Sequence, residues 1–223
     1  MICNKGSQNE TSSYLVKYCG SSWADSDIPA YGTGEVISFI VYNNKLYAIW
    51  HTWGLFVYSD ENHTWQSVCT DDIYGKLLIY NNNLYMSGYK SSDGSQVYRL
   101  YKFNFTNQTA TCDVAFSYPS NVSYLDVAVI NNKIYCVGSP SSVYPTNLYR
   151  LDDTTWTDCG SLPYGYSVYG DGTSLVAYND KLHLLGSAKT ETDAVKHYSY
   201  DGTSWVQETD MPYVYYLGRT IVI

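Results

Sequence analysis

The sequence predicts an all-β protein built from a repeated β-hairpin. The repeated element is an Asn-rich pair followed by a short apolar stretch, and it occurs four times. Apolar residues also precede each pair, which supplies the two left-handed backbone positions of a tight turn between two strands. Successive copies lie about 38, 50 and 48 residues apart, a period typical of arrays of small β-sheets. The copies are Asn43–Tyr47, Asn81–Tyr85, Asn131–Tyr135 and Asn179–His183.

Two further strands are predicted after each hairpin. A polar loop of variable length precedes a strand with alternating aromatic residues, and a turn that ends at a Trp follows this strand. Asp or Gly residues form the turn, and Trp23, Trp65, Trp156 and Trp205 each open a fourth strand. In the second copy, residues 101–106 lead to no Trp, so the register of its last strands is left open.

These residues resemble kelch repeats, the four-stranded blades of one family of β-propellers. In that family an Asn/Gly-Lys-Leu-Tyr hairpin precedes a glycine pair, and a Tyr and a Trp follow. Nearly the whole chain shares this pattern. It departs at the glycine pair, because only the first glycine is present, as Gly88, Gly138 and Gly186, and Trp50 stands there in the first copy. The resemblance implies a propeller of four-stranded blades.

The two ends of the chain predict a five-bladed propeller, although kelch propellers usually have six or seven blades. Met1 lies as far before Trp23 as His183 lies before Trp205, so the chain begins within a second strand. Residues 218–223 match the first strand of a blade. We therefore expect a single closed domain in which the C-terminal strand joins the N-terminal strands, with a fragment of a longer array as the alternative. The expected blades are residues 34–73, 74–122, 123–170 and 171–216, with residues 1–33 plus 217–223 as the fifth.

The amino-acid composition favours some classes of binding partner over others. The net charge of -8, with only 13 Lys and Arg, argues against nucleic acid, which needs a concentrated basic surface. The 26 Tyr suit both aromatic-rich sheets and surfaces that bind through Tyr contacts, and the composition resembles that of bacteriophage tail and receptor-binding proteins. Neither a signal-peptide core nor an apolar membrane span is found. We therefore expect a cytoplasmic or virion-associated protein.

No motif predicts catalysis or a bound metal. The six Cys form no Cys-x-x-Cys pair and suggest core residues, with disulfides between neighbouring blades as the alternative. The four His form no His-x-x-x-His pair. Residues 199–205 resemble a shortened aspartate box of sialidases, but Arg99, Arg150 and Arg219 are not expected to form the arginine triad of those enzymes. We expect no cofactor, no metal and no enzymatic activity.

The predicted fold places function on one face. In a propeller the second-to-third strand loops and the blade-to-blade loops share the face where ligands commonly bind. Here these loops are long and varied, whereas the turns of the other face are short and repetitive. We therefore expect a non-catalytic recognition module that binds a glycan or a protein ligand, such as an adhesin or a virion receptor-binding component. A structural or assembly scaffold is the first alternative, and a glycoside-active enzyme is the second.

Tyrosines recur at the blade-to-blade connections and predict an aromatic ring of binding residues. Aromatic faces stack on the apolar faces of sugars and anchor protein partners, while hydroxyls and carboxylates form hydrogen bonds. The alternative is that these tyrosines pack against the neighbouring blade. The expected ligand-binding residues are Tyr31, Tyr74, Tyr118, Tyr164, Tyr213, Trp53, Tyr144, Asp71 and Asp72.

A polar residue recurs on each predicted first strand, five positions before the Asn-rich pair. Burying it between blades would leave polar groups unpaired, so we expect these residues to line a water-filled channel. The alternative is that they cap neighbouring backbone groups. The residues are Ser38, Lys76, Asp126, Ser174 and Thr220.

Overall fold

The structure is a computed structural model, and contacts divide it into two compact units. The units are Met1–Ala115 and Phe116–Val222, and the expected single domain stays a prediction. The described residues are 2–5, 14–18, 23–25, 36–93, 98–118, 123–139, 147–163, 174–185 and 196–209.

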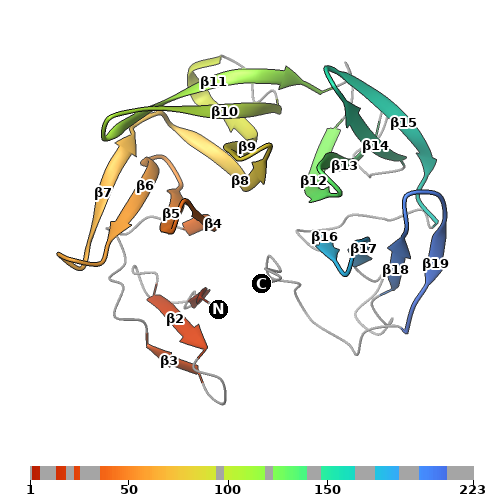
Figure 1. The fold of residues 1–223 in the computed structure, drawn as a ribbon, viewed down its shortest axis with the longest axis horizontal. Helices are drawn as coiled ribbons and strands as arrows, with labels where there is room; N and C mark the ends of the chain where they lie inside the picture. Colours follow the sequence, from red (N-terminus) through yellow and green to blue (C-terminus); the bar gives the residue numbers. More distant parts are fainter. Residues whose placement is uncertain are drawn as a thin grey trace. The chain divides into compact units, whose positions relative to one another are not determined.

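The first unit contains three antiparallel sheets (Figure 1). The first sheet has strands β1 (Ile2–Lys5), β2 (Tyr14–Tyr18) and β3 (Trp23–Asp25). The second has β4 (Val36–Tyr42), β5 (Lys45–Trp50), β6 (Gly54–Ser59) and β7 (Thr64–Cys69). The third has β8 (Ile73–Tyr80), β9 (Asn83–Lys90), β10 (Arg99–Thr106) and β11 (Thr109–Ser117), with a 3-10 helix, η1 (Ser91–Asp93), after β9.

The second unit contains two antiparallel sheets of four strands each. One is formed by β12 (Ser123–Ile130), β13 (Lys133–Ser139), β14 (Asn147–Asp152) and β15 (Thr155–Ser161). The other is formed by β16 (Ser174–Tyr178), β17 (Lys181–Leu185), β18 (His197–Tyr200) and β19 (Trp205–Gln207). In every sheet the strands lie in chain order, as a blade requires.

The Asn-rich pairs form the predicted tight turns. Both residues of all four pairs have positive φ, between 46° and 58°, which is the backbone of a two-residue type I′ hairpin. Asn and Asp tolerate this left-handed region better than other residues with a Cβ. The second copy also completes its blade, because β10 and β11 pair across a turn in which Asn107 has a φ of 59°.

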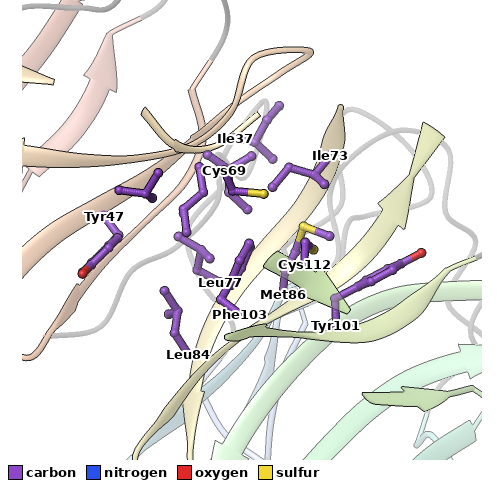
Figure 2. Packing of buried hydrophobic residues seen from close by; sticks show 13 residues of the cluster. Ile37, Tyr47, Cys69, Ile73, Leu77, Leu84, Met86, Tyr101, Phe103 and Cys112 are labelled. Carbon is purple, nitrogen blue, oxygen red and sulfur yellow. The ribbon is translucent and has the colours of Figure 1, made fainter. Parts of the chain in front are cut away.

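The apolar faces of adjacent sheets pack together within each unit. Figure 2 shows this core in the first unit, where Ile37, Tyr47 and Cys69 of the second sheet approach Leu77 and Met86 of the third. In the second unit the corresponding core joins the sheet of β12–β15 to that of β16–β19. Complete burial of a Leu, Ile or Met side chain contributes about 1.5 to 3 kcal/mol, so these faces hold neighbouring blades together.

Four of the described cysteines are consistent with the core interpretation. Cys69, Cys112 and Cys136 are buried, Cys159 is half-buried, and all four are free thiols. Burial raises the pKa of Cys69 to about 11, so its thiol is uncharged at neutral pH.

Four complete four-stranded blades are described, not the five that we predicted. The sheet of β1–β3 has three strands. Trp23 opens β3 as Trp205 opens β19, so these strands correspond to the second, third and fourth strands of a blade. The missing first strand was expected from residues 217–223, which lie outside the described part of the chain. Closure of a fifth blade is therefore not shown.

Candidate functional site

A row of three tyrosines crosses one end of the β8–β11 sheet. Tyr74 pairs with Tyr89 in the register of β8 and β9, and the register of β9 and β10 places Tyr98 beside Tyr89. Cross-strand neighbours share one face of a sheet. The rings of Tyr74 and Tyr89 stack with centroids 5.4 Å apart, and the ring of Tyr98 meets Tyr89 edge-on at 5.6 Å. All three side chains are half-buried.

Two glycines bring the strands under this row together. Gly75 and Gly88 face each other in the β8–β9 ladder. A Cβ on Gly88 would lie 2.0 Å from the Tyr74 carbonyl oxygen, and one on Gly75 would lie 2.3 Å from the Ser87 oxygen. Only glycine fits at such a close backbone approach. Gly88 is the glycine of the kelch-like pattern that this chain keeps. It allows β8 and β9 to approach closely next to the stacked Tyr74–Tyr89 pair.

The β5–β6 loop adds the ring of His51 to the row and also carries Trp53. His51 meets Tyr74 edge-on at 5.3 Å, and Trp53 in the same loop is 44% exposed. Gly54 follows with a φ of 101°, and a Cβ there would lie 2.0 Å from the Cys69 carbonyl oxygen. The loop therefore lies against the backbone at the end of β7. We call His51, Trp53, Tyr74, Tyr89 and Tyr98 the tyrosine-row site.

Charged side chains border the tyrosine-row site in pairs. Lys90 Nζ lies 2.8 Å from Asp71 Oδ2 and donates to the Cys112 carbonyl oxygen at 3.3 Å. The Asp72 side chain is exposed, and its carbonyl oxygen accepts a hydrogen bond from the Ser91 amide at 2.9 Å. These contacts connect the β7–β8 segment to the end of β9.

A second pair fixes the segment that carries Tyr98. Arg99 Nη1 donates to Asp93 Oδ2 at 2.7 Å, and the Tyr101 hydroxyl donates to the same oxygen at 2.8 Å. Tyr101 is fully buried, and burial followed by its bond to Asp93 raises its pKa to about 12. Asp93 thereby holds η1 against the start of β10.

The pKa values of Tyr89 and Lys90 are both raised. Burial raises the pKa of Tyr89, and the neighbouring Tyr74 and Asp72 raise it further. Burial alone would lower the pKa of Lys90, but its hydrogen bond and ion pair with Asp71 outweigh this effect and the pKa is raised. The tyrosine is therefore a neutral hydrogen-bonding group, and the lysine is charged.

The structure places some of the expected ligand-binding residues at the tyrosine-row site, whereas Tyr118 lies elsewhere. Tyr74 contacts His51 and Tyr89 in the tyrosine-row site, Trp53 lies in the loop that carries His51, and Asp71 and Asp72 border the site. Tyr118 is only 7% exposed and packs on Trp156 with ring centroids 4.9 Å apart, as the packing alternative describes. The remaining four, Tyr31, Tyr144, Tyr164 and Tyr213, lie outside the described residues.

Sequence reasoning did not select His51, Tyr89 or Tyr98. His51 and Tyr89 stand at the starts of loops that vary between the copies, and no turn or spacing signal marks them. The alternation of β9 could have placed Tyr89 beside Tyr74 once the hairpin turn fixed the register. Tyr98 follows the longer loop between β9 and β10. The length of this loop does not fix the register of the two strands, so the sequence does not place Tyr98 beside Tyr89.

The recurrent polar residues of the first strands bond to the next blade. Ser38 Oγ accepts from the Leu77 amide at 3.0 Å, and Asp126 Oδ2 accepts from the Leu175 amide at 2.8 Å. In each case the donor directly follows the recurrent polar residue of the next blade. Leu77 follows Lys76, and Leu175 follows Ser174. Asp126 and Ser174 are 8% and 6% exposed. The backbone-capping alternative thus describes Ser38 and Asp126.

Lys76 and Thr220 are two other residues of this polar set. Lys76 is half-buried and engaged in an interaction, and Thr220 lies outside the described residues. A channel lined by the whole set stays a prediction.

The histidines of the second unit form a separate polar pair. His183 Nδ1 lies 2.8 Å from His197 Nε2, and Ser199 Oγ, on the same strand as His197, donates to Glu208 Oε1 at 2.6 Å. Burial and then the charge of His197 lower the pKa of His183. Among the described residues, no three His, Cys, Asp or Glu side chains are grouped to hold a metal ion.

No helix in the described ranges has the length and apolar character needed to cross a membrane.

No protein-family model and no curated protein matches the chain. Among solved structures, the structure of this chain is similar to the structure of SapL1 lectin in complex with alpha methyl fucoside, with a TM-score of 0.54 and 8% sequence identity. The similarity covers 91% of this chain and 73% of the lectin chain. At this identity the likeness concerns the fold alone, and it supports a β-propeller of four-stranded blades. It does not extend to the kelch family or to phage proteins.

Proposed function

We propose that this chain is a non-catalytic recognition module that binds a glycan at the tyrosine-row site. The observation that carries the proposal is the set of four contacting rings, His51, Tyr74, Tyr89 and Tyr98, at the loop-bearing end of two adjacent sheets. Their side chains are half-buried, so the rings are held in place while part of each surface stays open.

The chemistry of the site fits a sugar. Sugars present apolar C–H faces, which stack on aromatic rings, and hydroxyl groups, which need donors and acceptors. Trp53 offers an exposed ring, the tyrosines offer hydroxyls, and Asp72 offers an exposed acceptor. Rigid aromatic side chains bind at low entropic cost, because two side-chain torsions fix each of them.

The fold is compatible with this role. A lectin of similar fold was solved with alpha methyl fucoside, so a propeller of this kind can carry a saccharide site. Our proposal extends to Tyr31, Tyr144, Tyr164 and Tyr213 as binding residues at other connections, to a fifth blade closed by the C-terminal strand, and to an adhesin or virion receptor-binding role.

The first experiment removes the stacking surface. We expect the Tyr74→Ala/Tyr89→Ala double variant, screened on a glycan array that includes methyl fucoside, to lose at least about tenfold in affinity for every glycan that the intact chain binds. Tyr178→Ala is the matched control, because Tyr178 is 52% exposed on the second unit and is no part of the site.

Circular dichroism should confirm that both variants fold. Undiminished binding by the folded double variant would exclude the tyrosine-row site. Binding of no glycan by the intact chain would favour the scaffold alternative.

A further inference from the structure

We infer that the tyrosine-row site selects uncharged saccharides and discriminates against glycans that carry sialic acid, uronic acid or sulfate. This inference rests on the proposed glycan-binding function and adds a ligand class to it. The arrangement of charge around the rings carries it.

Both cations at the edge of the site are already neutralised. Lys90 is 2.8 Å from the Asp71 carboxylate, and Arg99 is 2.7 Å from the Asp93 carboxylate. Proteins recognise the carboxylate or sulfate of a sugar through charge-assisted hydrogen bonds from such cations. An acidic glycan would have to displace Asp71 or Asp93 before it gained this interaction.

Two more lysines share the face of the row: Lys102 lies four residues after Tyr98, towards the far end of the sheet, and Lys76 lies nearer the rings and is not free. Lys76 lies two residues after Tyr74 on β8, so both side chains leave the same face of the strand. The Lys76 side chain is half-buried and engaged in an interaction. It is therefore not an unoccupied docking point for an anion.

Among the described residues that border the rings, the charge without an ion pair is that of the Asp72 carboxylate. Asp72 is exposed and takes part in no ion pair among the described residues. The charge of Asp72 contributes to the raised pKa of Tyr89, after the larger effects of burial and of Tyr74. A ligand on the rings therefore meets one uncompensated carboxylate, which repels an anion but accepts hydrogen bonds from sugar hydroxyls.

The expected discrimination is modest and depends on salt. A unit charge about 7 Å away in a largely solvated site changes affinity roughly threefold to tenfold, and physiological salt screens part of this effect. Two variants change the charge without removing a ring. Asp72→Asn removes the free carboxylate, and Asp71→Asn releases Lys90 from its ion pair.

The test uses the full chain on an array that presents each neutral oligosaccharide beside the same oligosaccharide capped with sialic acid or carrying sulfate. We expect the neutral member of each pair to bind more strongly. In Asp72→Asn and Asp71→Asn, binding of the acidic members should rise roughly threefold to tenfold relative to the neutral members. Asp180→Asn is the matched control, because Asp180 is exposed in a turn of the second unit, where Asn occupies the same place in the other copies.

Each outcome separates this inference from the proposed function. Equal or stronger binding of acidic glycans, abolished by Tyr74→Ala/Tyr89→Ala, would overturn the inference and leave the proposed function standing. Binding that the double variant does not reduce would overturn both, because the site would lie elsewhere. Binding of no glycan at all would overturn both as well. A rise with Asp180→Asn equal to that with Asp72→Asn would assign the selectivity to net charge and overturn the local account.

Discussion

Individual residues in this chain depart from the repeat where the structure gives them a separate role. Three of the four hairpins place a Tyr after the turn, as Tyr47, Tyr85 and Tyr135, but the last places His183. This histidine lies 2.8 Å from His197, a distance at which two protonated rings would repel each other. The substitution therefore turns a packing position into a titratable one.

The His183 substitution predicts a loss of stability in mild acid. Burial, then His197 and more weakly Lys181, lower the pKa of His183, and these outweigh the opposing effects of the Tyr178 backbone and Glu208. Because the folded pKa lies below that of the unfolded chain, the unfolded chain binds more protons as the pH falls through about 6.5. Stability from this group is therefore present above that pH and is lost below it.

The measurement is the unfolding midpoint at pH 8 and at pH 5. We expect the decrease between these values to be smaller in His183→Tyr, which restores the residue of the other copies, than in the intact chain. His183→Gln serves as a second variant if the larger ring does not fit beside His197. An equal decrease in all three proteins would contradict a role for His183.

At the scale of the element, the β8–β9 hairpin links stability to the proposed site. Its turn, Asn81 and Asn82, sets the register that places Gly75 opposite Gly88 and Tyr74 opposite Tyr89. The close glycine contact and the stacked tyrosines are adjacent steps of one ladder. A change that separates the strands should therefore affect both folding and binding.

Gly88→Ala tests this coupling. The added Cβ would meet backbone atoms, 2.0 Å from the Tyr74 oxygen and 2.6 Å from the Gly75 Cα, so the strands must move apart. We expect a decrease of about 1 to 3 kcal/mol in the free energy of unfolding, together with weaker glycan binding. Denaturant titration and the glycan array measure the two effects.

Gly160→Ala is the control for this prediction. Gly160 has a φ of 98° but no atom within 4 Å of an added Cβ, so the variant carries backbone strain without a clash. It should lose stability and keep its binding. Unchanged stability and binding in Gly88→Ala would show that the close approach in β8–β9 is easily relieved.

The sequence predicts the hairpins better than the site for a physical reason. The left-handed turn positions are a local property of Asn43 or Asn131, so the strands beside them follow directly from the chain. The placement of His51 against Tyr74 depends on Gly54 fitting the backbone at Cys69, which is a tertiary contact. The sequence does not predict the hydrogen-bond partner of Asp126, because that partner, the Leu175 amide, lies 49 positions away along the chain.

At the scale of the whole molecule, the β1–β3 sheet differs from the others because it has three strands. The other four sheets each have four strands in chain order, and β3 begins with the Trp that opens fourth strands. In the described part of the chain, β1 is therefore a second strand without a first strand beside it. An unpaired strand edge invites aggregation, so a partner for β1 would be protective.

We expect the C-terminal residues Arg219–Ile223 to be this partner. Three apolar side chains buried in the strand would contribute about 1.5 kcal/mol each, and for a chain of this size each kcal/mol shifts the unfolding midpoint by roughly 2 to 4 °C. Deleting Arg219–Ile223 should therefore lower the midpoint by roughly 9 to 18 °C. A synthetic peptide of residues 217–223, added in excess, should restore part of the loss, while a scrambled peptide should not. An unchanged midpoint after the deletion would mean that β1 has no partner in this segment, and the fifth blade would have to be abandoned.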